Sequence, residues 1–170
     1  MNKKIIAIIG ALSLLSACET ASQKVVTGTS ATSGSASASS SVDKKKSLFA
    51  QAKQTAADKL IAVGDRVLFD YDSAKLDSSA KILLDAQSRF LRANTDLNFI
   101  VEGHCDERGT REYNLALGEQ RATAVRDYLV IQGIDPDRIK VISYGKEKPA
   151  VVGSNSMAWS KNRRAVTVID

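Results

Sequence analysis

The stretch from Val101 to Arg121 narrows the folds open to this chain more than any other part of it. A short apolar run, residues 97–102, leads there into the charged loop HCDERGTREY, and a pattern typical of a long amphipathic helix begins near Asn114. In α/β folds, the junction between a strand and the following helix is the usual position of a binding site. We therefore expect this loop to be the functional centre of the chain.

The sequence around the loop alternates between strand-like and helix-like patterns. Apolar runs that indicate strands occupy residues 66–70, 97–102, 139–144 and 164–170, and helical periodicity covers residues 79–94 and 114–132, where Gly133 is the expected stop. The order strand, helix, strand, helix, strand, strand predicts an α/β sandwich in which a mixed four-stranded sheet packs against helices. We expect this domain to occupy residues 65–170.

The N-terminus has the pattern of a bacterial lipoprotein signal. Lys3 and Lys4 precede an apolar run over residues 5–15, which is too short to span a bilayer because that requires about 20 apolar residues. The run ends in LSAC, which resembles a lipobox and implies removal of residues 1–17 and attachment of acyl chains, palmitate among them, to Cys18. The alternative is an ordinary signal peptide with an incidental cysteine. Two or more acyl chains hold a protein stably, and Glu19, in place of the usual inner-membrane aspartate, favours the outer membrane, with the domain facing the periplasm.

Between Cys18 and the domain lies a segment that has no means of forming a core. Residues 18–46 are dominated by Ser, Thr, Ala and Gly and contain no aromatic residue, which predicts a disordered, flexible tether. Residues 47–64 follow as a lead-in segment, in which a short helix would place on one stripe Leu48, Ala52, Ala56 and Leu60. Without the two lysines of the signal, the chain has 22 basic and 19 acidic residues, an excess of +3 that does not argue for nucleic-acid binding.

The loop holds four consecutive potential ligands, His104 to Glu107, but their spacing argues against a metal or catalytic site. Zinc ligands normally come in spaced pairs, and His104 is the only histidine. Adjacent side chains in an extended backbone point to opposite faces, so His104 and Cys105 are badly placed as base and nucleophile, and Asp106 and Glu107 cannot flank a scissile bond. We expect a hydrogen-bonded structural histidine, a small, partly buried thiol, and no metal, cofactor or enzymatic activity.

Binding chemistry fits the loop better. Asp106 offers an acceptor for an ammonium group, and Arg121 offers a planar guanidinium for a carboxylate. Together they would hold a zwitterionic amino-acid end, and replacing either should abolish binding while leaving stability largely intact. An internal Asp106–Arg121 ion pair that merely ties the loop to the helix is equally compatible with the sequence.

Several motifs resemble the OmpA-like peptidoglycan-binding domain family. They are FDYD (69–72), VEGHCDERGTREYNLALGEQRATAV (101–125), VISYGKEKPAV (141–151) and SKNRRAV (160–166), and together they span about residues 65–170. The resemblance implies the OmpA-like βαβαββ fold and noncovalent binding of the peptidoglycan stem peptide through its meso-diaminopimelate residue. It also implies which residues contact that ligand: Asp106, Arg121, Arg108, Thr110, Leu117, Tyr71 and Asp72.

Other positions in these motifs have different expected roles. Tyr113 and Asn114 should order the loop, and one of Arg163 and Arg164 should line the rim of the pocket. Cys105 departs from the family, since relatives carry alanine, threonine or serine there; all of these residues are small, so the site should survive the change.

The resemblance is narrower when the whole chain is considered, and it then points to the peptidoglycan-associated lipoproteins of the Tol–Pal system. The features that carry it are the lipobox, the tether and the motifs DERGTREYN and SYGKEKPA. This implies partnership with TolB and TolA, and a role in holding the envelope layers together and in cell division. Two alternatives stay open: an OmpA-like wall-binding lipoprotein outside the Tol system, and a peptidoglycan-cleaving enzyme.

Overall fold

The computed structural model describes residues 39–170, with side chains from Lys45 onward, so that the predicted signal peptide, Cys18 and the tether up to residue 38 lie outside the described residues. The helices and strands are α1 (Ser39–Val63), β1 (Arg66–Leu68), α2 (Ser78–Ala93), β2 (Phe99–His104), α3 (Arg111–Ile131), a short 3-10 helix (Pro136–Arg138), β3 (Ile139–Gly145), α4 (Ser156–Asn162) and β4 (Arg164–Ile169). In this part of the chain, no helix combines the length and the apolar character needed to cross a membrane.

The four strands form one mixed sheet in the order β1-β4-β2-β3. β2 and β3 are parallel and are connected through α3, whereas β4 is antiparallel to both β1 and β2. This confirms the predicted α/β fold with a mixed four-stranded sheet. Arg164 at the start of β4 is paired with Leu68 on one side and with His104 on the other. The ends of β1 and β2 and the start of β4 therefore lie side by side at one end of the sheet. The segments that follow β1 and β2 meet there, together with the residue that precedes β4.

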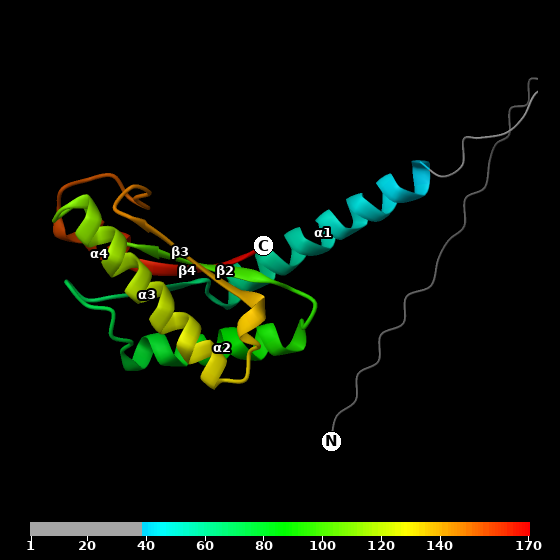
Figure 1. Cartoon of the computed structure of the whole chain (residues 1–170), viewed down its shortest axis with the longest axis horizontal. Coiled ribbons are helices and arrows are strands. Elements are labelled where there is room, and N and C mark those ends of the chain that lie inside the picture. Colours follow the sequence, from blue (N-terminus) through cyan, green and yellow to red (C-terminus); the bar gives the residue numbers. More distant parts are fainter. Residues whose placement is uncertain (1–38) are drawn as a thin grey trace, which may run out of the picture. The chain divides into compact units, whose positions relative to one another are not determined.

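The core lies between the sheet and helices α2 and α3, which cover the same face (Figure 1). It is built from buried aliphatic and aromatic side chains, among them Val67, Leu84, Leu91, Phe99, Val101, Val125 and Leu129. Helix α3 approaches β2 very closely, since a Cβ atom at Gly103 would lie 1.8 Å from the carbonyl oxygen of Gly118. This contact holds the first half of α3 against the end of β2, where the candidate loop begins.

Several boundaries differ from those predicted. Helix α3 begins at Arg111 instead of Asn114, because the side chain of Thr110 accepts a hydrogen bond from the backbone of Tyr113 and caps the helix. Strand β2 starts at Phe99 and extends to His104, and β1 ends at Leu68. Helix α4 was not predicted, because its seven residues are too few to show a helical period, although Asn155 caps it by accepting from the backbone of Ala158.

Helix α1 also begins earlier than the predicted lead-in segment, at Ser39 instead of residue 47. The run from residue 39 to residue 63 contains no glycine or proline, and its lysines, alanines and leucines favour a helix despite the serines. Gly64, with a φ of 110°, ends it. Ala56 and Leu60 are buried, so the C-terminal part of α1 belongs to the packed domain, together with α2 and β4.

Candidate functional site

A small pocket opens where the segments after β1 and β2 meet the first turns of α3. It has a volume of about 50 Å³, which is room for a small charged group. Six of the seven residues predicted to bind ligand line it: Tyr71, Asp72, Asp106, Arg108, Leu117 and Arg121. The seventh, Thr110, is not part of the lining, and its side chain caps α3 instead.

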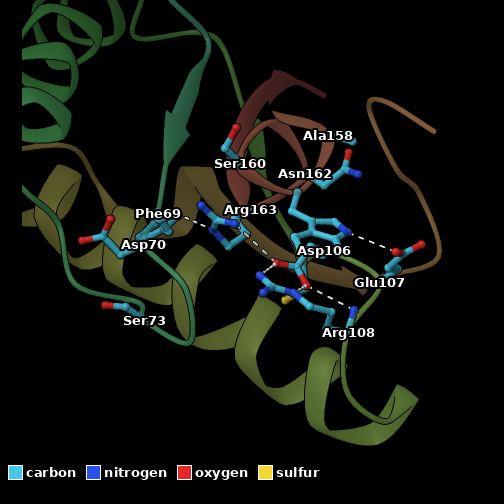
Figure 2. Close-up of polar contacts among 12 residues, drawn as sticks. Phe69, Asp70, Ser73, Asp106, Glu107, Arg108, Ala158, Ser160, Asn162 and Arg163 are labelled. Carbon is cyan, nitrogen blue, oxygen red and sulfur yellow. Dashed lines mark hydrogen bonds and ion pairs between the residues drawn. The ribbon is translucent and has the colours of Figure 1, made fainter. Parts of the chain in front are cut away.

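Asp106 follows directly on β2 and is buried, with an exposed fraction of 5%. Its carboxylate accepts hydrogen bonds from the Nε of Arg108 at 3.1 Å and from the Nη2 at 2.5 Å, and the backbone N–H of Arg108 donates to it at 3.1 Å. Arg163 adds a longer contact at 3.5 Å (Figure 2). Burial by itself raises the pKa of Asp106, but the hydrogen bonds and the positive charge of Arg108 outweigh it and leave the pKa below its ordinary value. Asp106 is therefore a carboxylate at neutral pH.

Arg108 is held in place by aromatic side chains as well as by Asp106. Its guanidinium carbon lies 4.1 Å from the ring centroid of Tyr71 and 4.2 Å from that of Trp159. The Nε1 of Trp159, in α4, donates to a carboxylate oxygen of Glu107 at 3.0 Å, which fixes the indole beside the loop. Trp159 was not predicted as a site residue, although it is the only tryptophan of the chain and stands close before a pair of arginines.

Arg121 is fully buried and does not pair with Asp106. Its Nε donates to the carbonyl of Ser73 at 2.8 Å, its Nη2 to that of Asp70 at 3.1 Å, and its Nη1 to that of His104 at 2.9 Å. Its Nη1 also contacts the Sγ of Cys105 at 3.4 Å. A guanidinium carries five N–H groups, so these four acceptors leave one N–H of Nη2 for a ligand. The predicted bidentate fork is thus largely engaged by the protein, and Arg121 joins the turn after β1 to the end of β2.

Arg163 also presents a guanidinium to the pocket. It lines the pocket, its side chain is 16% exposed, and its Nε donates to the carbonyl of Phe69 at 3.0 Å (Figure 2). Arg164 instead points away from the pocket lining and donates to the carbonyls of Lys148 and Asn162. Of the two arginines considered for the rim, the structure therefore places Arg163 at the pocket.

Tyr113 and Asn114 make the contacts expected of loop-ordering residues. The Nδ2 of the buried Asn114 donates to the carbonyls of Arg108 and Thr110, at 2.7 Å and 3.0 Å. The hydroxyl of Tyr113 donates to the carboxylate of Asp72, which sits in a left-handed turn with a φ of 53°. These bonds tie the loop after β2 to α3 and to the turn after β1.

His104 and Cys105 lie at the base of the site. His104 is buried, as its predicted structural role requires, but the prediction that its ring is hydrogen-bonded was wrong, because neither ring nitrogen has a hydrogen-bond partner among the described residues. Burial and the nearby charge of Arg164 lower its pKa to about 4, so the ring is neutral above that pH. Cys105 is buried against Asn114 and Arg121, and burial raises the pKa of its thiol.

The chain resembles known proteins over the whole region that carries this pocket. Residues 68–163 match the model of the OmpA family, and all eleven lining residues fall within them. The peptidoglycan-associated lipoprotein of Rhizobium meliloti is 52% identical over 109 residues, which are 64% of this chain and 62% of that protein. The protein of the same name from Mesorhizobium japonicum is 49% identical over 115 residues, 68% of each chain.

A solved structure agrees with the fold described above. The crystal structure of the peptidoglycan-associated lipoprotein from Burkholderia pseudomallei matches with a TM-score of 0.61 at 39% identity, over 62% of this chain and 90% of that one. The matched domain therefore makes up nearly all of that chain. The present chain spans 62% to 68% of the two curated relatives named above.

Proposed function

The chain belongs to the OmpA family, and on that premise we propose that its pocket binds peptidoglycan noncovalently, through the diaminopimelate residue of the stem peptide. The proposal is carried by one observation: a buried, ionised aspartate shares a small pocket with three arginines. Relatives at about half identity are named for their association with peptidoglycan, which supports the same ligand.

The charges of the pocket suit a zwitterionic group. Arg108, Arg121 and Arg163 stand against Asp72 and Asp106, so the lining carries three positive and two negative charges, a net +1. The second stereocentre of diaminopimelate carries an ammonium and a carboxylate. Asp106 would accept from the ammonium, and Arg163, together with the free N–H of Arg121, would donate to the carboxylate. The pocket volume matches such an end group, with the rest of the peptide outside.

Calorimetry with two stem peptides tests this assignment. The domain should bind a diaminopimelate-containing peptide roughly 10- to 100-fold more tightly than its lysine counterpart, because lysine lacks the second carboxylate and leaves the arginines unpaired. Asp106→Asn should abolish binding to purified sacculi, while Asp127→Asn, which changes an exposed carboxylate of the same domain, should leave it unchanged. Equal affinity for the two peptides would show that the recognised group is another one.

The remaining parts of the proposal concern the envelope. We propose that acyl chains on Cys18 anchor the protein in the outer membrane and that the domain, facing the periplasm, links this membrane to the wall. Mass spectrometry of the chain purified from cells should find the acyl chains on Cys18, and Cys18→Ser should release the protein from the membrane fraction. An unmodified Cys18 in a membrane-free protein would contradict the anchor.

Partnership with TolB and TolA, and support of cell division, rest on the resemblance of the motifs alone. A pull-down of TolB by residues 39–170 tests the partnership, and competition by the stem peptide would place the contact near the pocket. Absence of a complex would favour a wall-binding lipoprotein outside the Tol system. Release of soluble muropeptides from sacculi would favour an enzyme instead.

A further inference from the structure

Helix α1 has an apolar stripe that continues beyond the part packed in the domain. Ala56 and Leu60 lie on this stripe and are 8% and 1% exposed, since they pack within the domain. Phe49 precedes Ala56 by seven residues, which is nearly two helical turns and puts it on the same side of the helix. Phe49 and its neighbour Leu48 are nevertheless 59% and 57% exposed. These two side chains therefore form an exposed apolar surface on α1, beyond the part of the helix that packs in the domain.

Lysines border this exposed surface. Lys45 and Lys46 are exposed one turn before Phe49, and the Nζ of Lys53 lies 5.5 Å from the centroid of the Phe49 ring. No acidic residue occurs between Lys44 and Ala57. The nearest acidic residues in the sequence, Asp43 and Asp58, lie at the two ends of this surface, and the carboxylate of Asp170 interacts electrostatically with Lys53. The surface thus combines two large apolar side chains with three positive charges. This combination is typical of helices that lie in the plane of an anionic lipid surface.

We propose that residues 45–56 of α1 form a second membrane contact, in which Leu48 and Phe49 enter an anionic lipid surface and the lysines bind its phosphates. This inference rests on the proposed acylation of Cys18 to bring the helix to the membrane. The 20 residues between Cys18 and Ser39 reach at most about 70 Å even when fully extended. The helix is therefore confined near the bilayer, where the high local concentration of lipid strengthens the contact.

The charges favour a lipid surface over a second copy of this chain. Pairing of two identical stripes would bring the lysines of both helices together, six positive charges in one contact, and like charges across an interface oppose association. An anionic bilayer pairs with the same lysines favourably, and its hydrocarbon accepts Leu48 and Phe49.

Vesicle flotation tests the proposal with residues 39–170, which contain the whole described core and lack Cys18. Vesicles of phosphatidylcholine containing phosphatidylglycerol should carry this chain upward, and vesicles of phosphatidylcholine alone should not. The triple change Lys45→Gln, Lys46→Gln, Lys53→Gln should weaken partitioning on the order of 100-fold, because each lysine near an anionic surface contributes about a factor of five. Phe49→Ser should weaken it at least about tenfold.

Ile61→Ser is the matched control. Ile61 is also 59% exposed on α1, but it lies twelve residues after Phe49 and hence roughly 120° away around the helix. It should leave flotation unchanged. Equal binding to neutral vesicles, no flotation at all, or an equal loss with Ile61→Ser would overturn the proposal. So would a concentration-dependent dimer that Phe49→Ser dissociates, because this would assign the stripe to a second copy.

Binding to sacculi serves as the separate readout for the pocket. The α1 variants should bind sacculi like the unchanged chain, and Asp106→Asn should float with anionic vesicles like the unchanged chain. Loss of wall binding by itself would thus contradict the proposed function and leave the membrane contact standing, and loss of flotation would do the reverse.

Discussion

Asp106 and Arg121 carry opposite charges in one pocket, yet each is bonded to other groups. Asp106 holds Arg108, while Arg121 donates to three backbone carbonyls and none of the ion pairs within residues 39–170 includes it. A buried cation whose hydrogen bonds go mainly to backbone carbonyls and that lacks an ion-pair partner attracts an incoming carboxylate. The sequence left two alternatives open: Asp106 and Arg121 hold a ligand together, or they form an ion pair with each other. The structure adds a third role, because Arg121 also joins two segments of the domain through its hydrogen bonds, and Asp106 does not share this role.

This difference corrects the expectation that replacing Arg121 would leave stability largely intact. Arg121→Lys should lower the free energy of unfolding by roughly 2–4 kcal/mol, because one ammonium cannot reach all three carbonyls, which lie in two separate segments, and leaves some of them unpaired in the interior. Urea unfolding measures the change. Arg126→Lys on the same helix, where the side chain is paired with Asp127 at the surface, should shift it by less than about 0.5 kcal/mol. If Arg121→Lys were as stable as the unchanged chain, Arg121 would have no structural role.

His104 allows a test in which pH is the only variable. Its pKa is about 4 in the folded chain against 6.5 for an ordinary histidine, so the unfolded chain takes up the proton first as the pH falls. The contribution of His104 to the free energy of unfolding is therefore constant above pH 6.5. Between pH 6.5 and 4 it lowers this free energy, by ~3 kcal/mol in total.

Nuclear magnetic resonance measures this directly, because His104 is the only histidine and its imidazole signals need no assignment. The signals should titrate with a midpoint near pH 4 in the folded protein and near 6.5 in urea. A midpoint near 6.5 in both states would mean that the ring is open to water.

At the scale of helices and strands, an element could be predicted from the sequence when its apolar pattern was long enough to show a period. The helices α2 and α3 and the strands β3 and β4 were placed within three residues of their ends, because each carries a full apolar period on its core-facing side. Helix α4 has seven residues and no such period, and the Ser39 end of α1 lies in a serine-rich run. These two were missed because a few residues with mixed propensities do not define a helix without their tertiary contacts.

The sequence predicted which residues line the site, but it did not predict which hydrogen bonds and contacts these residues make. The motifs assigned six of the eleven lining residues to ligand contacts, but the partners of Arg121 come from segments about 50 positions away, which no local pattern reveals. Arg108 was predicted to contact the ligand. Its contacts with Tyr71, Trp159 and Asp106 could not be predicted, because Trp159 is positioned by α4.

The close contact between β2 and α3 gives a prediction for a whole element. Gly103→Ala should prevent the native packing or cost at least about 3 kcal/mol, since its Cβ would lie 1.8 Å from the backbone oxygen of Gly118 and only a shift of α3 relieves the clash. Thermal unfolding measures the loss.

Gly133→Ala serves as the comparison, because its Cβ would have nothing within 4 Å although its φ is +89°. It should cost only about 1–2 kcal/mol, the ordinary penalty for an L-residue in the left-handed region. If both alanines had the same effect, the Gly103–Gly118 contact would not be what positions α3.

At the scale of the whole molecule, the proposed function needs two attachments on one chain. Acyl chains at Cys18 would hold the membrane end, and the pocket near Asp106 would hold the wall end. The 20 residues between Cys18 and Ser39 add at most about 70 Å to the reach of the domain. Neither attachment alone links two layers, so bridging should fail completely when either one is lost.

Bridging can be measured by whether sacculi sediment vesicles that carry the acylated full-length chain. Neutral phosphatidylcholine vesicles should be used, because they exclude any contribution from the lysines of α1. The unchanged chain and Asp127→Asn should bring the vesicles down with the sacculi, and free stem peptide should release them by competition. Asp106→Asn should leave the vesicles in the supernatant, because the chain stays anchored while the pocket loses the acceptor for the ammonium group. Cys18→Ser should bind sacculi without vesicles, because the pocket is intact and the anchor is missing. Sedimentation of vesicles by Asp106→Asn would show that the wall is held through another surface of the domain.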